Sequence, residues 1–139
     1  NDYHEALEHI ETIADAPEDP TEGREYWRRL ARQDAFSQGI QYTLTDHDLD
    51  AIAFPDVQVV PPVAERYHTG EITRADVPTN TFIASQSGCP AISLPAGLTD
   101  DGLPVGVELL GAPFADRQLV SFAAAYEADV DPRTPPELS

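Results

Sequence analysis

The stretch that decides the fold lies at residues 91–111 and reads AISLPAGLTDDGLPVGVELLG. Two apolar segments flank a central Asp-Asp-Gly turn, and Gly102 suits that turn because glycine tolerates a positive φ. Alternate residues of a strand point to opposite faces. The alternating apolar residues are Ile92, Leu94 and Ala96 on the first segment and Val105, Val107 and Leu109 on the second. The stretch therefore predicts a hairpin of two strands.

Upstream of this hairpin, the sequence predicts two helices and a further strand. A short amphipathic helix is expected over residues 2–14, and a longer one over residues 23–44 after a proline-rich acidic linker. The apolar face of the longer helix consists of Trp27, Leu30, Ala31, Ala35, Phe36 and Ile40. Residues 51–54 form an almost continuous apolar run closed by Pro55, which indicates a strand buried on both faces.

Helices are also expected on either side of the hairpin. Residues 56–78 are rich in proline and valine and predict an extended connection, and residues 79–87 predict a short helix that ends at Gly88. Asp116 is a suitable N-cap for a final helix. The buried stripe of that helix is expected to consist of Leu119, Phe122, Ala123 and Tyr126. Residues 131–139 are expected to pack loosely.

The order of these elements predicts an α/β fold in which helices cover a sheet. A sheet of only three strands would leave its edges bare, which is unfavourable. The chain is therefore expected to be one end of a larger sheet, as a partial α/β/α layered sandwich.

The charge balance excludes two classes of partner. The 139 residues include 25 acidic and 8 basic side chains, and the formal net charge is −17. A field this negative repels nucleic acid and anionic membranes, so neither is expected as a partner. All eight basic residues are arginine. Such an acidic surface without lysine indicates a salt-loving organism, where salt screens the self-repulsion; an ordinary acidic protein is the alternative.

Cysteine usage and the start of the chain indicate a cytoplasmic location. Cys89 is the single cysteine, so no internal disulfide can form, which fits a reducing compartment. The first residues lack the features of a signal peptide, and no apolar stretch approaches the length of a membrane span. Because the chain starts at Asn1 rather than Met, a processed or truncated start is expected.

Two groups of residues have the composition of a metal site but the wrong spacing. His4 and His9 are five residues apart, about 140° around a helix, so they cannot share one metal ion. Asp46, Asp48 and Asp50 alternate as in a calcium loop, but the glycine and the glutamate that such a loop needs are missing. They are expected to form an acidic turn, and no metal ion or cofactor is expected.

The sequence also provides no activated cysteine or serine nucleophile. Cys89 stands between a glycine and a proline and is expected to be a small buried residue. Ser85, Ser87 and Ser93 are not part of a Gly-x-Ser-x-Gly turn, and the histidines are distant in sequence.

Two sequence elements resemble the carboxy-terminal region of the amidase signature family. They are TNTFIASQSGCPAISLPAG at residues 79–97 and DGLPVGVELLG at residues 101–111, followed by Pro113 and Phe114. The clear resemblance covers residues from about 79 to 127, with a looser one from about 46. Residues 1–139 are therefore expected to be the carboxy-terminal segment of a single amidase domain.

The resemblance implies a large α/β/α sandwich around a mixed sheet, and hydrolysis or transfer at the carbon–nitrogen bond of amides. The family uses a serine nucleophile, a bridging serine and a lysine base, with an oxyanion hole in a glycine- and serine-rich stretch. This chain has no lysine and no Gly-Gly-Ser-Ser-Gly stretch, so no catalytic residue can be assigned to any position. An inactive fragment of an amidase is therefore expected, with a non-catalytic acidic interaction or structural module as the alternative.

Partners and substrate contacts follow from the same resemblance. The complete enzyme is expected to bind a small amide and could form a homo-oligomer. Asn80, Ser85 and Gln86 are the candidates for facing the substrate pocket, and hydrogen bonding at a packed helix end is the alternative. Transamidases that act on charged tRNA usually have Asn-Leu-Ala-Gly at residues 85–88, and many family members have arginine at Ala112. Both departures favour a general amidase.

Overall fold

The protein is described by a computed structural model that defines residues 17–73, 76–77, 80 and 82–130. The elements are η1 (Pro20–Glu22), α2 (Arg24–Asp46), β1 (Ile52–Pro55), α3 (Ala64–His68), α4 (Phe82–Ser87), β2 (Ala91–Leu98), β3 (Pro104–Leu110) and α5 (Asp116–Asp129). The helix expected over residues 2–14 and the tail at 131–139 lie outside the described residues. The order of the described elements matches the prediction with two exceptions: η1 lies in the expected acidic linker, and α3 interrupts the expected extended connection.

The hairpin is confirmed, and β3 is the central strand of the sheet that it forms. The strand order is β1-β3-β2, and both pairings are antiparallel. Gly102 has a φ of +79° in the turn, as expected. The register shifts between Pro95 and Gly97, which disrupts the predicted alternation, and Ala96 is exposed. Bulges of this kind locally bend and twist a strand.

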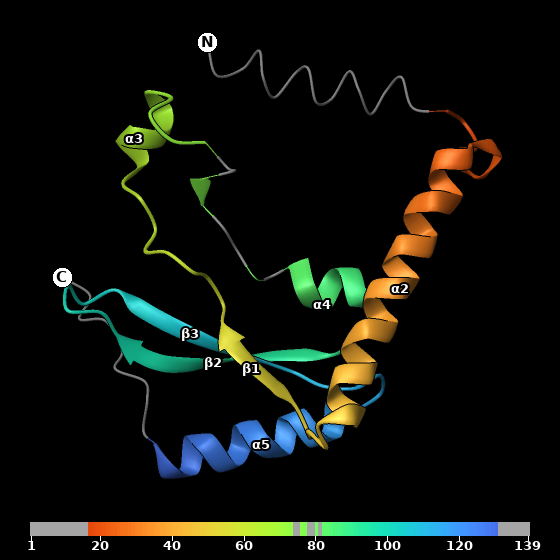
Figure 1. Cartoon of the computed structure of the whole chain (residues 1–139). Helices are drawn as coiled ribbons and strands as arrows, with labels where there is room; N and C mark the ends of the chain where they lie inside the picture. The colour runs from red at the N-terminus through yellow and green to blue at the C-terminus, as the bar shows by residue number, and fades with distance from the viewer. Residues whose placement is uncertain (1–16, 74–75, 78–79, 81, 131–139) are drawn as a thin grey trace.

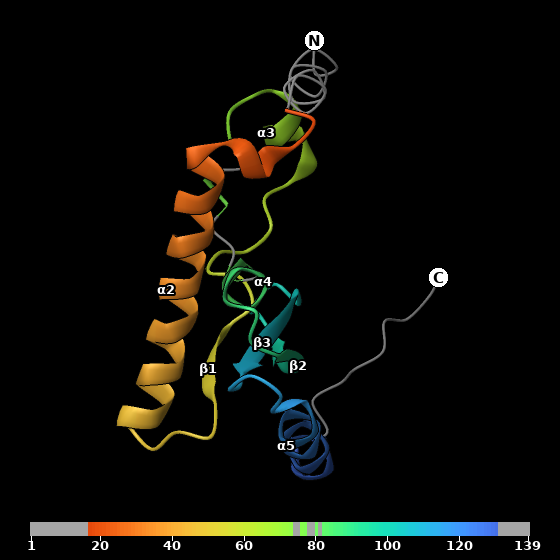
Figure 2. The ribbon, with the colours of Figure 1, turned by 90° about the vertical axis from the view of Figure 1, so that its right-hand side faces the viewer.

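Helices lie on opposite sides of this sheet. Figures 1 and 2 show α4 on one side and α5 on the other, with α2 running past α4 and the β1 edge. The register pairs Ile92 with Leu109 and Leu94 with Val107, so these predicted alternating residues of the two strands share one face. Residues of the other face of β3 are covered as well. Leu110 and Glu108 are the buried residues of β3, whereas Val105 is exposed. The result is a partial layered α/β fold.

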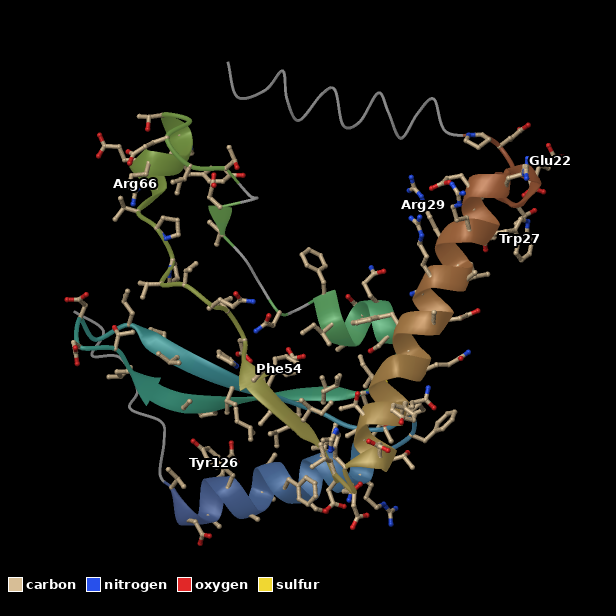
Figure 3. All side chains as sticks on the ribbon, viewed as in Figure 1. Glu22, Trp27, Arg29, Phe54, Arg66 and Tyr126 are labelled. Atoms are coloured by element: carbon tan, nitrogen blue, oxygen red, sulfur yellow. The ribbon has the colours of Figure 1, made fainter. Side chains whose placement is uncertain are left out.

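The core on the α4 side joins residues from five elements and turns. Its buried members are Ile40, Leu44, Cys89 and Leu110, with Ile52, Phe54, Ile83 and Ala84 packed against them. On the other side, the predicted stripe of α5 is confirmed: Leu119 and Ala123 are buried, and Phe122 and Tyr126 are half-buried. The hydroxyl of Tyr126, which is labelled on α5 in Figure 3, donates to the carbonyl of Pro95 at 3.0 Å. Cys89 is buried, as predicted.

Three expectations about burial and capping are corrected. β1 is not buried on both faces: Ala53 is exposed, because α5 packs on β2 rather than on β1. Most of the apolar face of α2 is also exposed, including Phe36 and Trp27, of which Trp27 is labelled in Figure 3. Only its last turns reach the core. The N-cap of α5 is Ala115, and Asp116 is the first helical residue, where its charge still favours the helix dipole.

Candidate functional site

Three polar side chains meet on the face of the sheet that α4 covers. Glu108 of β3 lies opposite Phe54 of β1 and Ser93 of β2, so all three residues share one face. Asp56 follows β1 directly, and its carboxylate oxygen Oδ2 accepts a hydrogen bond from the Ser93 hydroxyl. We call Asp56, Ser93 and Glu108 the acid cluster.

Gly106 makes room for the Asp56 carboxylate. The backbone N–H of Asp56 donates to the carbonyl of Gly106 at 3.1 Å, which extends the pairing of β1 and β3 by one residue. A Cβ atom at position 106 would lie 2.0 Å from Asp56 Oδ2, closer than real Cβ contacts allow. Glycine is therefore required for this carboxylate position.

Two carboxylate oxygens of the acid cluster are buried without a hydrogen-bond partner among the described residues. They are Oδ1 of Asp56 and Oε1 of Glu108. Burial, and to a smaller extent the nearby Asp56 charge, raises the pKa of Glu108 above its ordinary value. Buried acceptors without partners are rare in folded proteins and require a physical explanation.

Asn80 connects the end of β1 to the start of α4. Its side-chain nitrogen donates to the carbonyl of Pro55 at 2.6 Å, and its side-chain oxygen accepts from Gln58 Nε2 at 2.9 Å. Its backbone N–H donates to the carbonyl of Asp56, and its own carbonyl accepts from the N–H of Ile83. These bonds are hydrogen bonds next to the end of a helix, which is the role expected for Asn80 as the alternative to contacting substrate.

Ser85 lines a hollow of about 480 Å³ where α4, the turn into β2 and the start of α5 meet. The other lining residues are Ala84, Gly88, Cys89, Pro90, Pro113, Phe114 and Asp116. The Ser85 hydroxyl donates to the carbonyl of Phe82 at 3.2 Å. Phe114 is 96% exposed and has a φ of +69°, an unusual combination for an aromatic residue.

Gln86 belongs to a different hollow, of about 420 Å³, against α2. Its neighbours there are Arg29, Arg32, Gln33 and Phe36. Successive residues of a helix are separated by about 100°, which is why Ser85 and Gln86 face different hollows. Asn80, Ser85 and Gln86 are therefore close in the chain but do not gather around one site in the described structure.

The described residues contain no group of three or more His, Cys, Asp and Glu side chains that could hold a metal ion. The expected acidic turn instead makes a structural contact, because Gln118 Nε2 of α5 donates to Asp50 Oδ1 at 2.8 Å. His4 and His9 lie outside the described part of the chain. Among the helices that are described, none has both the length and the apolar character needed to cross a membrane.

The acid cluster is not predicted from the sequence, although one signal for it is present. Glu108 is the single charged residue between Leu103 and Gly111, in a stretch predicted to be a strand. A charge in such a strand indicates either an exposed face or a special environment. Its neighbours Asp56 and Ser93 are 52 and 15 positions away in sequence, as their numbers show, so only the register of the sheet reveals the cluster.

The chain belongs to the Amidase family, whose sequence model matches residues 5–120. It is 38% identical over 78 residues to a subunit of the glutamyl-tRNA(Gln) amidotransferase of Haloarcula marismortui, a match that covers 56% of this chain and 18% of that protein. It is 37% identical over 92 residues to the mandelamide hydrolase of Pseudomonas putida, with coverage of 66% and 18%.

Solved structures of amidases share this fold. The native peptide amidase of Stenotrophomonas maltophilia superposes with a TM-score of 0.70 and 30% identity, covering 89% of this chain and 24% of that one. A peptide amidase in complex with the competitive inhibitor chymostatin gives a TM-score of 0.72 and 28% identity, with coverage of 91% and 25%. The chain thus spans about a fifth of the length of these relatives and a quarter of these structures.

Proposed function

We propose that this chain is the carboxy-terminal part of an amidase-type hydrolase that cleaves carbon–nitrogen bonds of amides. The observation that carries the proposal is the family match over residues 5–120 together with the superposition on a peptide amidase. In this role the chain supplies strands of the central sheet, covering helices and one wall of the substrate pocket. The groups that break the amide bond lie outside these 139 residues.

The chemistry of the side chains supports this division of roles. The sequence has no lysine to act as the base that the family resemblance implies. The Ser93 hydroxyl is committed to Asp56, and the buried Ser87 hydroxyl donates to the carbonyl of Ala84 at 3.2 Å. A serine nucleophile needs an adjacent base to be activated. We therefore expect this chain alone to be inactive.

A small amide is the substrate class that we propose. Ser85 and Gln86 remain candidates for contacting it, because each lines a hollow on the surface of α4. Asn80 remains a candidate with a weaker case, because its amide already has partners at Pro55 and Gln58. The departures at residues 85–88 and at Ala112 favour a general amidase over a tRNA transamidase.

The cellular setting is part of the same proposal. The net charge of −17 and the absence of lysine support a cytoplasm of high salt concentration, without nucleic acid or membrane as a partner. The half-exposed apolar face of α2 supports contact with further protein, either the rest of the amidase domain or another copy in a homo-oligomer.

A non-catalytic acidic module is the second candidate. The observation that favours it is the core of Ile40, Leu44, Cys89 and Leu110, which the chain builds from its own residues. A module of this kind would fold and stay monomeric by itself. A part of a larger domain would instead expose the sheet edges at β1 and β2 and would associate or bind hydrophobic dye.

The coding sequence that precedes Asn1 separates these two candidates. The amidase proposal expects it to continue in frame and to encode a lysine and a glycine- and serine-rich stretch. A start codon directly before Asn1 would support the module instead. The matching biochemical experiment is ammonia release from mandelamide and from a peptide amide, measured for this chain and for the extended polypeptide.

A further inference from the structure

The acid cluster contains two carboxylates, and no ion pair within the described part of the chain neutralises either one. The sequence has no charged side chain at residues 35–45 of α2, at 51–55, at 57–63 or at 80–99, and Glu108 is the single charge of β3. The described ion pairs of arginine are all made with Glu25 or Glu71. Asp56 and Glu108 therefore lie on one face of the sheet without a described cation beside them.

The burial of the two oxygens restricts what can neutralise them. Oδ1 of Asp56 and Oε1 of Glu108 are both covered, and Glu108 as a residue is 8% exposed. An arginine side chain from another part of the protein could not reach these buried oxygens unless the residues that cover them moved away. A proton needs no additional space, and a protonated carboxyl can donate a hydrogen bond to an ionised one. The Asp56 charge is near enough to contribute to the raised pKa of Glu108, and two neighbouring buried carboxylates cannot both remain ionised at low cost.

We propose that a proton on Glu108 is shared with Asp56 through a hydrogen bond, and that this proton controls how firmly α4 is attached to the sheet. Burial and the Asp56 charge favour Glu108 as the group that carries the proton. The Ser93 hydroxyl occupies Oδ2 of Asp56, which leaves Oδ1 to accept from Glu108. This pair is independent of whether the chain belongs to an active hydrolase.

The attachment of α4 follows from the backbone of Asp56. Its carbonyl accepts from the N–H of Asn80, and the preceding carbonyl, that of Pro55, accepts from the Asn80 side chain. Asn80 in turn bonds to Ile83 in the first turn of α4. Loss of the shared proton places two negative charges side by side and displaces Asp56 from Gly106. We therefore expect α4 to loosen as the pH rises.

The direction of the pH dependence can be stated from the shift at Glu108. A group whose pKa is raised by folding stabilises the folded chain fully below its unfolded pKa, about 4.3 for glutamate. That stabilisation is lost as the pH rises through the raised value. Other acids also ionise in this range, so the contribution of the pair must be measured as a difference between variants.

Glu108→Gln tests the proposal, with Asp100→Asn as the matched control. The glutamine amide donates to Asp56 at every pH and replaces the proton, whereas Asp100 is an exposed acid in the hairpin turn. We expect the unfolding midpoint of the wild-type chain and of the control to fall as the pH rises from about 5 to about 8, at constant salt. In Glu108→Gln the fall should be smaller, and the midpoint at the upper pH should exceed that of the wild type by several degrees.

A carboxyl-detected NMR titration of the wild-type chain provides the second measurement and needs no variant to fold. We expect the Glu108 carboxyl to titrate above the ordinary glutamate range. Amide exchange in α4 should accelerate over the same pH range, while exchange in α5 should not. Ordinary titration of Glu108, or a pH slope in Glu108→Gln equal to that of the wild type, would overturn the proposal.

Discussion

Gly106 shows at the scale of one residue how the acid cluster is made possible. Its missing side chain leaves the space that the Asp56 carboxylate occupies, and Gly106 lies within β3, next to the register shift in its pairing with β2. The same position in a strand of ordinary composition would hold a side chain. Glycine is therefore required at position 106 because of the close contact with Asp56. A positive φ is not the reason, since the φ of Gly106 is not in that range.

Replacing Gly106 with alanine should disrupt this contact. The new Cβ would lie 2.0 Å from Asp56 Oδ2, so the carboxylate must move and the hydrogen bond from Ser93 must break. We expect a loss of about 1–3 kcal/mol in the free energy of unfolding, as for other overpacked sites. Denaturant unfolding measures it.

Gly39→Ala is the matched control for that substitution. Gly39 lies within α2, and nothing is within 4 Å of a Cβ built there. Alanine should stabilise the helix by about 0.5–1 kcal/mol. If both alanine variants change stability equally, the contact at position 106 does not constrain the chain.

Leu110 carries the largest expected packing loss of any single residue in β3. It is 1% exposed and belongs to the core between α2, α4 and the sheet. Leu110→Ala should cost about 2–5 kcal/mol of unfolding free energy, because it removes buried methyl groups and leaves a cavity. Leu98→Ala, at the exposed end of β2, should cost far less. Equal losses in the two variants would contradict the position of the core.

At the scale of elements, the sequence predicts those whose signals are local. The Asp-Gly turn, the glycine at position 88 and the stripe of α5 each depend on neighbouring residues, and the structure confirms them. The burial of β1 and of α2 depends on which other elements pack against them. A local sequence pattern does not carry this information. The sequence does not predict α3, because it is a short helix within a proline-rich connection.

The candidate site is less predictable than the fold for the same reason. Asn80, Ser85 and Gln86 are near one another in sequence, but helix geometry directs Ser85 and Gln86 to different hollows. Asp56 and Glu108 are adjacent only because β1 and β3 pair in one particular register. A prediction of the strand pairing would be needed to find them.

The attachment of α4 by Asn80 leads to a prediction at this scale. Asn80→Ala removes the side-chain bonds to Pro55 and Gln58, each worth about 1 kcal/mol. Amide exchange should accelerate in α4 and at the end of β1, with little change in α5. Gln118→Ala, which removes a comparable long-range bond to Asp50, is the control. Exchange in α4 that is equally fast in both variants would show that Asn80 is not the attachment point.

The whole molecule is dominated by its negative charge. With a formal net charge of −17, the folded chain repels itself, and salt reduces this repulsion. Raising KCl from about 0.1 M to about 1 M shortens the screening length from about 10 Å to about 3 Å. We expect the thermal unfolding midpoint to rise over this range and to rise further with more KCl. A midpoint that falls or stays constant would contradict a salt-adapted surface.

The central claim is that this chain is part of an amidase-type hydrolase and that the groups that cleave the bond lie outside it. The match to the Amidase family covers residues 5–120, and the chain spans about a quarter of the solved peptide amidases. Ammonia release from an amide tests this claim most directly, for the purified chain and for the same chain joined to its preceding coding sequence. The account predicts release by the extended polypeptide and none by the chain alone. Release by the chain alone that persists with a serine-hydrolase inhibitor, or none by the extended polypeptide, would contradict it.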